Sequence, residues 1–163
     1  MIFIVLGTHE LPFQRLLKVV EEEIKAGNIT SDVMVQSGHT SYESEHMKLI
    51  PFMTYHEMEA YYQKADYIIT HGGTGSITTA VKMGKKLIAI PRLHKYGEHN
   101  DDHQLEIVRQ FTESGHILSW NEDGPFSDVI RQISSFHPAP FVSGRKKILS
   151  IIEDFIAHEG KRN

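Results

Sequence analysis

The stretch from Tyr67 to Pro91, YIITHGGTGSITTAVKMGKKLIAIP, sets the strongest limit on what this chain can fold into. A short β-rich segment leads through three glycines in four positions to a helix-compatible segment and then to a second apolar segment. This order is typical of a βαβ unit, in which a glycine turn joins a buried strand to a helix N-terminus. Such a turn lets backbone N–H groups approach an anion. The stretch therefore predicts an α/β protein with an anion-binding turn.

Strand-like and helix-like segments alternate along the rest of the chain. Strands are predicted at Ile2–Leu6, Asp32–Gln36, Lys48–Met53, Tyr67–Thr70, Leu87–Ile90 and Ile117–Ser119. Helices are predicted from Pro12 to Gly27, at Tyr55–Lys64, Ser76–Met83, Asp102–Ser114 and Ser127–Ser135, and over a last stripe of Ile148, Ile151, Ile152, Phe155 and Ile156. Alternation of this kind indicates right-handed βαβ units around a parallel sheet. We expect residues 1–163 to form a single Rossmann-like domain with about six strands.

Composition narrows the classes of function. The formal net charge of −4 argues against broad nucleic-acid binding, which depends on clustered Lys and Arg side chains. The chain has no cysteine, which excludes disulfides and thiolate metal sites and favours a reducing compartment. Its opening, MIFIVLGTHE, lacks the features of a signal peptide, and the apolar run there is far shorter than the roughly 20 residues that span a bilayer.

The glycine turn matches neither of two well-known phosphate loops. A dinucleotide fingerprint needs a third glycine where this chain has Thr78. A Walker loop needs a glycine where this chain has Thr79, and a Ser or Thr where it has Lys86. What remains is a Gly-Gly-x-Gly-Ser turn before a helix. Gly7-Thr8 occupies the equivalent place after the first strand, and two turns facing one crevice suit a diphosphate; the alternative is that both are simply tight turns.

Two longer segments carry a resemblance to a known family. The segment ADYIITHGGTGSITTAVKMGKKLIAIPR, followed by HNDDHQLEIVRQF, resembles the nucleotide-sugar-binding C-terminal domain of MurG-like glycosyltransferases, family twenty-eight, the donor-binding half of the GT-B fold. The opening GTHELPFQRLLK resembles PssE-type subunits of bacterial exopolysaccharide transferases. It is also similar to the small catalytic subunit of the eukaryotic two-chain transferase that adds N-acetylglucosamine to a dolichol-linked oligosaccharide.

The resemblance implies a set of donor-binding residues. Contacts to the diphosphate and donor sugar are implied for Gly72, Gly73, Thr74, Gly75 and Ser76, with His71 shaping the same pocket. Gly7 and Thr8 are expected at the same crevice because of their place after the first strand. Phe52-Met53 correspond to the turn that grips the base, and Asp102, His103 and Gln104 to the side chains that contact sugar hydroxyls. The family's acidic residue for the ribose falls at Thr79, which is a departure. No metal or other cofactor is implied, although His99 and His103 have the four-residue spacing that places two imidazoles on one helix face.

The implied reaction is displacement at the anomeric carbon of a UDP-sugar by an acceptor hydroxyl, with inversion. A general base must lie within about 3 Å of that hydroxyl. His9 is the first candidate because it follows the first strand, Glu10 is the second, and a residue of a partner protein is the third possibility.

The chain has the length of the donor half alone, so the resemblance implies a partner. We expect a membrane-anchored subunit that binds a lipid-linked saccharide acceptor, and a cytoplasmic chain held at the inner membrane face by that subunit. The predicted function is the donor-binding catalytic subunit of a UDP-sugar hexosyltransferase in exopolysaccharide or capsule biosynthesis. Two alternatives stay open: a non-catalytic stabilising or regulatory subunit, and an enzyme resembling UDP-sugar epimerases.

Overall fold

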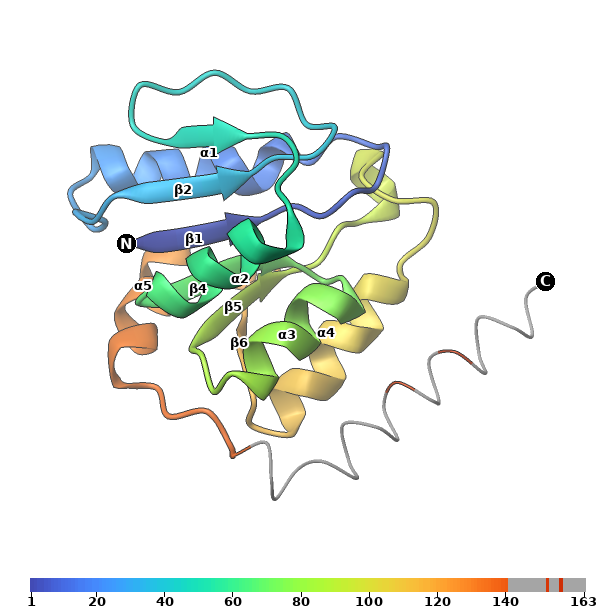
Figure 1. Cartoon of the computed structure of the whole chain (residues 1–163). Helices are drawn as coiled ribbons and strands as arrows, with labels where there is room; N and C mark the ends of the chain where they lie inside the picture. The colour runs from blue at the N-terminus through green and yellow to red at the C-terminus, as the bar shows by residue number, and fades with distance from the viewer. Residues whose placement is uncertain (141–151, 153–155, 157–163) are drawn as a thin grey trace.

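The computed structural model describes residues 1–140 together with Ile152 and Ile156, and a six-stranded parallel sheet forms its centre (Figure 1). The strands are β1 (Ile2–Val5), β2 (Val33–Gln36), β3 (Lys48–Ile50), β4 (Tyr67–His71), β5 (Leu87–Ile90) and β6 (Leu118–Ser119). They lie in the order β3-β2-β1-β4-β5-β6, and all neighbouring pairs are parallel. This is the order of a doubly wound Rossmann-like sheet, so the predicted fold class is confirmed.

Helices cover both faces of the sheet (Figure 1). The helices α1 (Gln14–Lys25) and α5 (Phe126–Ser135) pack on one face, and α2 (Tyr55–Lys64), α3 (Thr74–Lys82) and α4 (His103–Glu113) pack on the other. The short 3-10 helix η1 (His94–Tyr96) follows β5. Side chains alternate along a strand. Ile2 and Ile4 therefore pack in the core beneath α1 and α5, and Phe3 and Val5 pack in the core beneath α2, α3 and α4. This explains why β1 reads as an unbroken apolar run.

Many predicted boundaries differ from the observed ones by one to three residues, and three of the differences bear on the site. β3 ends at Ile50 instead of Met53 because Pro51 has no N–H group, and the Pro51 carbonyl accepts from the Gln36 side chain. α3 begins at Thr74, two residues earlier than predicted, so part of the glycine turn is helical. α4 begins at His103, with Asp102 at the N-cap position. Of the predicted last helix, only Ile152 and Ile156 are described, and both are helical; the rest of it lies outside the described residues.

The sheet has a topological switch point between β1 and β4. These strands are neighbours, and the chain proceeds from them toward opposite edges of the sheet. In such sheets a crevice opens beyond the carboxyl ends of the two strands. Gly7 lies two residues after Val5, the last residue of β1, and Gly72-Gly73 directly follow β4. The fold therefore brings the two glycine turns to one crevice.

Candidate functional site

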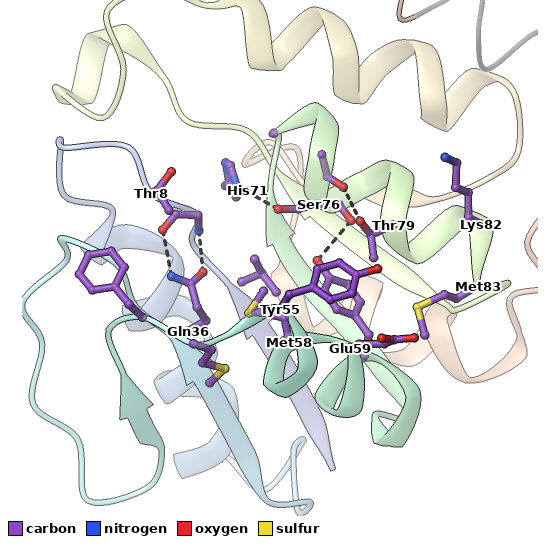
Figure 2. A pocket seen from close by; sticks show the side chains of 17 residues that line it. Thr8, Gln36, Tyr55, Met58, Glu59, His71, Ser76, Thr79, Lys82 and Met83 are labelled. Atoms are coloured by element: carbon purple, nitrogen blue, oxygen red, sulfur yellow. Dashed lines mark hydrogen bonds between the residues drawn. The ribbon is translucent and has the colours of Figure 1, made fainter.

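A cleft of about 730 Å³ lies at this switch point (Figure 2). Its walls come from the ends of β1, β2 and β4, from the first turns of α3, and from the segment that runs from Phe52 into α2. Among the predicted site residues, the cleft is lined by Gly7, Thr8, Phe52, Met53, His71, Gly73, Gly75, Ser76 and Thr79. The predicted residues outside its lining are His9, Glu10, Gly72, Thr74, Asp102, His103 and Gln104.

The N-terminus of α3 is open toward the cleft. Gly73 occupies the N-cap position without a side-chain cap, and the first turn contains no acidic residue. The first N–H groups of a helix have no partner within the helix, and the helix dipole adds partial positive charge there. Gly73, Gly75 and Ser76 all line the cleft. This is the arrangement of an anion-binding helix terminus.

His71, the last residue of β4, is held between the two glycine turns. A Cβ atom on Gly7 would lie 2.6 Å from its Nε2 atom, and a Cβ atom on Gly73 would lie 2.2 Å from its Cε1 atom. Both turns therefore need glycine, because the imidazole occupies the space that a side chain would take. Burial and then the positive charge of Arg92 lower the pKa of His71 to about 3, which keeps the ring neutral near pH 7.

Replacing Gly73 with alanine should lower the free energy of unfolding by about 1–3 kcal/mol, the usual cost of overpacking. Gly73 has φ −72°, so the effect is steric and does not come from the backbone conformation. Gly75→Ala is the matched control, because an added Cβ there meets nothing within 4 Å and alanine favours a helix. Urea unfolding followed by circular dichroism checks the pair. Equal stability of the two variants would contradict the packing argument.

Thr79 lies one turn further along α3 and lines the cleft. Its hydroxyl donates to the Gly75 carbonyl at 2.8 Å, so its hydrogen is used within the helix. Only oxygen lone pairs are then left for a ligand. The charged side chains in the lining are Glu59 and Lys82 (Figure 2). Within the cleft lining, Glu59 on α2 is therefore the carboxylate that is available to accept from the two hydroxyls of a ribose.

Gln36 lines the cleft and is not among the residues predicted from the sequence. Its Oε1 atom accepts from the Gly7 N–H at 2.9 Å, and its Nε2 atom donates to the Gly7 carbonyl at 3.0 Å (Figure 2). Nε2 also donates to the Pro51 carbonyl at 2.9 Å. The Gly7 amide is thus engaged with protein, which leaves Thr8 as the polar residue of that turn that faces the cleft. The signal available in the sequence was a glutamine at the end of the apolar segment VMVQ, and the structure buries its side chain.

Gln104 lies beneath the cleft. Its Oε1 atom accepts from the backbone N–H groups of Gly72 at 2.9 Å and Arg92 at 3.1 Å, and its Nε2 atom lies 3.1 Å from Nδ1 of His71. The resemblance implies contact with a sugar hydroxyl, but both ends of this amide bind protein groups. In the structure Gln104 joins the ends of β4 and β5 to α4.

Asp102 and His103 belong to a different hollow of about 330 Å³, which Asn100, Asp101, His94 and Glu106 complete. Asp102 accepts from the His94 N–H at 3.0 Å. His99 and His103 do not share a helix face, because α4 begins at His103; each has an Nδ1 atom close to the Asp101 carboxylate, at 3.1 and 3.3 Å. Within the described part of the chain, no group of three or more His, Asp or Glu side chains is placed to hold a metal ion.

His9 and Glu10 lie outside the cleft lining. His9 Nδ1 accepts from the Leu11 N–H at 3.1 Å, and its ring lies on that of His99 with centroids 4.5 Å apart. Burial, followed by the nearby His99 and Arg92, lowers the pKa of His9. The Glu10 side chain is 73% exposed. His9 therefore follows the cleft residue Thr8 in the chain and packs against the loop before α4.

Arg92 is a second residue near the site that was not predicted from the sequence. It is 1% exposed, and its guanidinium donates to the carbonyls of Leu6, Leu11 and Glu98 at 2.7–3.0 Å. Its charged group also lies 5.0 Å from the centre of the Phe13 ring. Arg92 thereby anchors both ends of the Gly7–Glu10 turn. An arginine directly after the apolar segment LIAIP was the only sequence signal.

A six-stranded parallel sheet with a cleft at its switch point places the chain among Rossmann-like α/β proteins. The family described as "Glycosyltransferase family 28 C-terminal domain" matches residues 1–135. The chain belongs to this family, and the predicted resemblance is confirmed at that level. The likeness to exopolysaccharide-transferase subunits stays a prediction.

Relatives and solved structures agree with this assignment. The chain is 29% identical over 100 residues to the UDP-N-acetylglucosamine transferase subunit ALG13 of Candida albicans, and the match covers 61% of this chain and 31% of that relative. An NMR structure of ALG13 superposes with a TM-score of 0.56 at 20% identity, covering 90% of this chain and 94% of that one. Acinetobacter baumannii MurG gives a TM-score of 0.55 at 18% identity, covering 81% and 40%. At these identities the two structures show the fold alone.

The chain thus spans about a third of the curated relative's length. Among the described helices, none has the length and hydropathy needed to cross a bilayer.

Proposed function

We propose that this chain is the donor-binding catalytic subunit of a two-component UDP-sugar hexosyltransferase. The observation that carries the proposal is the uncapped N-terminus of α3, which opens into a cleft between two glycine turns. Its amides and dipole would hold the diphosphate of the donor and would stabilise the charge on the departing UDP. The name of the Candida albicans relative supports UDP-N-acetylglucosamine as the first donor to test.

The proposal extends to the acceptor side. The family match covers a C-terminal domain, and the relative is named as a subunit, which together support a partner chain that completes the active site. We place a lipid-linked saccharide on that membrane-anchored partner, with this chain in the cytoplasm at the inner membrane face, in exopolysaccharide or capsule biosynthesis. The transfer would invert the anomeric centre without a metal. Because His9 and Glu10 follow the cleft residue Thr8 but lie outside the lining, the general base would be His9, Glu10 or a residue of the partner.

Calorimetric titration of the chain with UDP tests the proposal, with ADP and GDP as controls. We expect saturable binding of UDP and no binding of ADP or GDP. Gly75→Glu should weaken UDP binding by about tenfold or more, because a carboxylate at the open helix terminus repels the diphosphate. Gly75→Gln has nearly the same size without the charge and is the matched control; an added Cβ at this position meets no neighbouring atom within 4 Å, so both variants should fold.

A non-catalytic stabilising subunit is the second candidate, because Thr79 replaces the family's acidic ribose contact and its hydroxyl is used within α3. Titration of the complex with its partner separates the two candidates. UDP binding that appears only in the complex supports a donor pocket that the partner completes. Absence of UDP binding in both the chain and the complex would contradict donor binding and favour the stabilising subunit.

A further inference from the structure

Three side chains form a line from the core to the cleft. Gln104 on α4 lies 3.1 Å from Nδ1 of His71, and Nε2 of His71 lies 3.3 Å from Oγ of Ser76. Gln104 and His71 are both buried, at 8% exposure each, whereas Ser76 is half-buried and lines the cleft (Figure 2). The line therefore connects a fixed interior amide to a hydroxyl that a ligand can reach.

The orientation of the Gln104 amide is determined by its backbone neighbours. The N–H groups of Gly72 and Arg92 can only donate, and both lie within 3.1 Å of the same end of the amide. That end must therefore be the oxygen. The –NH2 group is then the end that faces His71, where it can only donate.

We propose that Gln104 is a positioning residue that holds His71 in the Nε2–H tautomer and thereby turns the Ser76 hydroxyl into a hydrogen-bond donor for an anionic ligand in the cleft. Nδ1 of His71 must carry a lone pair in order to accept from the Gln104 amide. In a neutral imidazole the hydrogen is then on Nε2, which faces Ser76.

The neutral state of His71 follows from its surroundings. A proton on Nδ1 would place two N–H donors against each other unless the Gln104 amide gave up both backbone donors. Burial, together with the charge of Arg92, also lowers the pKa of His71 to about 3. The tautomer, and not the protonation state, is thus the property that Gln104 controls near neutral pH.

The consequence reaches the cleft through Ser76. Nε2–H of His71 donates to Ser76 Oγ, so the hydroxyl hydrogen of Ser76 is left to point elsewhere, and Ser76 lies in the first turn of α3 beside the open amides. A donor hydroxyl adds to those amides in holding a phosphate oxygen. With the opposite tautomer, Nε2 would accept the Ser76 hydrogen and remove it from the ligand. This last step rests on the proposed function, because it takes the ligand to be a nucleoside diphosphate.

The tautomer is measured first, without any ligand, by NMR of the ¹⁵N-histidine-labelled full chain. We expect His71 to carry its hydrogen on Nε2 in the wild type and to have a protonated Nδ1 in Gln104→Glu. The glutamate keeps an oxygen for Gly72 and Arg92 and turns its second oxygen toward Nδ1. Gln110→Glu, on the same helix, is the control that adds the same charge and should leave the His71 signals unchanged. A wild-type Nδ1–H tautomer, or an unprotonated Nδ1 in Gln104→Glu, would overturn the proposal.

The second measurement is a double-mutant cycle of UDP affinity over Gln104→Glu and Ser76→Ala. Each single change should weaken binding by about tenfold or more, the usual worth of a hydrogen bond to a charged group. The double variant should bind no more weakly than Ser76→Ala alone, because Gln104 acts through Ser76. Additive losses, or no loss for Gln104→Glu, would refute the coupling. If UDP binds neither the wild-type chain nor its complex with the partner, the proposed function fails, while the NMR result still decides the tautomer.

Discussion

Replacing Arg92 with methionine should lower the free energy of unfolding by about 3–5 kcal/mol, the cost typical of removing one partner from a buried charged network. Methionine fills a similar volume but has no donors. The carbonyls of Leu6, Leu11 and Glu98 would therefore be left without the guanidinium to which they now bind. Burial lowers the pKa of Arg92 to about 10, so the side chain is still a cation near neutral pH. Urea unfolding at pH 7.5, followed by circular dichroism, measures the loss.

Two further variants distinguish the loss of the guanidinium hydrogen bonds from the loss of the charge and from a general effect of replacing arginine by methionine. Arg92→Lys keeps the positive charge but loses the planar guanidinium, so its free energy of unfolding should lie between those of the wild type and Arg92→Met. Arg109→Met makes the same exchange at an exposed position of α4 and should stay within about 0.5 kcal/mol of the wild type. If Arg92→Met were as stable as Arg109→Met, the anchoring role of Arg92 would be refuted.

The pattern of apolar segments predicted the sheet because its central strands bury both faces. Strands such as IFIV and LIAI read as continuous apolar runs, and their spacing leaves room for crossover helices. Short-range effects then set the observed boundaries. Pro51 ends β3 early, and the N-cap at Gly73 draws Thr74 into α3. Neither effect appears in a hydrophobic pattern, because each depends on single backbone N–H groups.

The site was predicted less completely than the sheet, for a different reason. The glycine turns carry their own signal because close approach requires glycine at adjacent positions in the sequence. Gln36, Arg92 and Gln104 have no such local signal, since their partners lie far away along the chain: Arg92 and Leu6 are 86 positions apart, and Gln104 and Gly72 are 32 apart. What they share is a polar side chain that the fold encloses at the carboxyl edge of the sheet.

The stability of the folded chain should fall in acid because of His71. The pKa of His71 is about 3 in the folded chain, against 6.5 for an unperturbed histidine, since burial penalises the imidazolium. Between these two values the unfolded chain binds a proton that the folded chain does not. The contribution of His71 is therefore fully present above pH 6.5 and is lost as the pH falls toward 3. Its slope approaches about 1.4 kcal/mol per pH unit within that window.

Urea unfolding of the wild type and of His71→Gln at several pH values between 7.5 and 4.5 isolates this contribution. The absolute stability of the variant will differ, so the slope is the quantity to compare. Carboxylates and the other histidines contribute equally to both curves, and the difference between the slopes therefore belongs to position 71. We expect about 2.7 kcal/mol less acid destabilisation for His71→Gln over this range, since the window reaches two pH units below 6.5. The exposed His56 is the control, and His56→Gln should follow the wild-type curve. Parallel curves for the wild type and His71→Gln would mean that the imidazole titrates in the folded chain as it does in the unfolded chain, as a ring open to solvent would. The neutral ring that the Gln104 tautomer requires would then be lost.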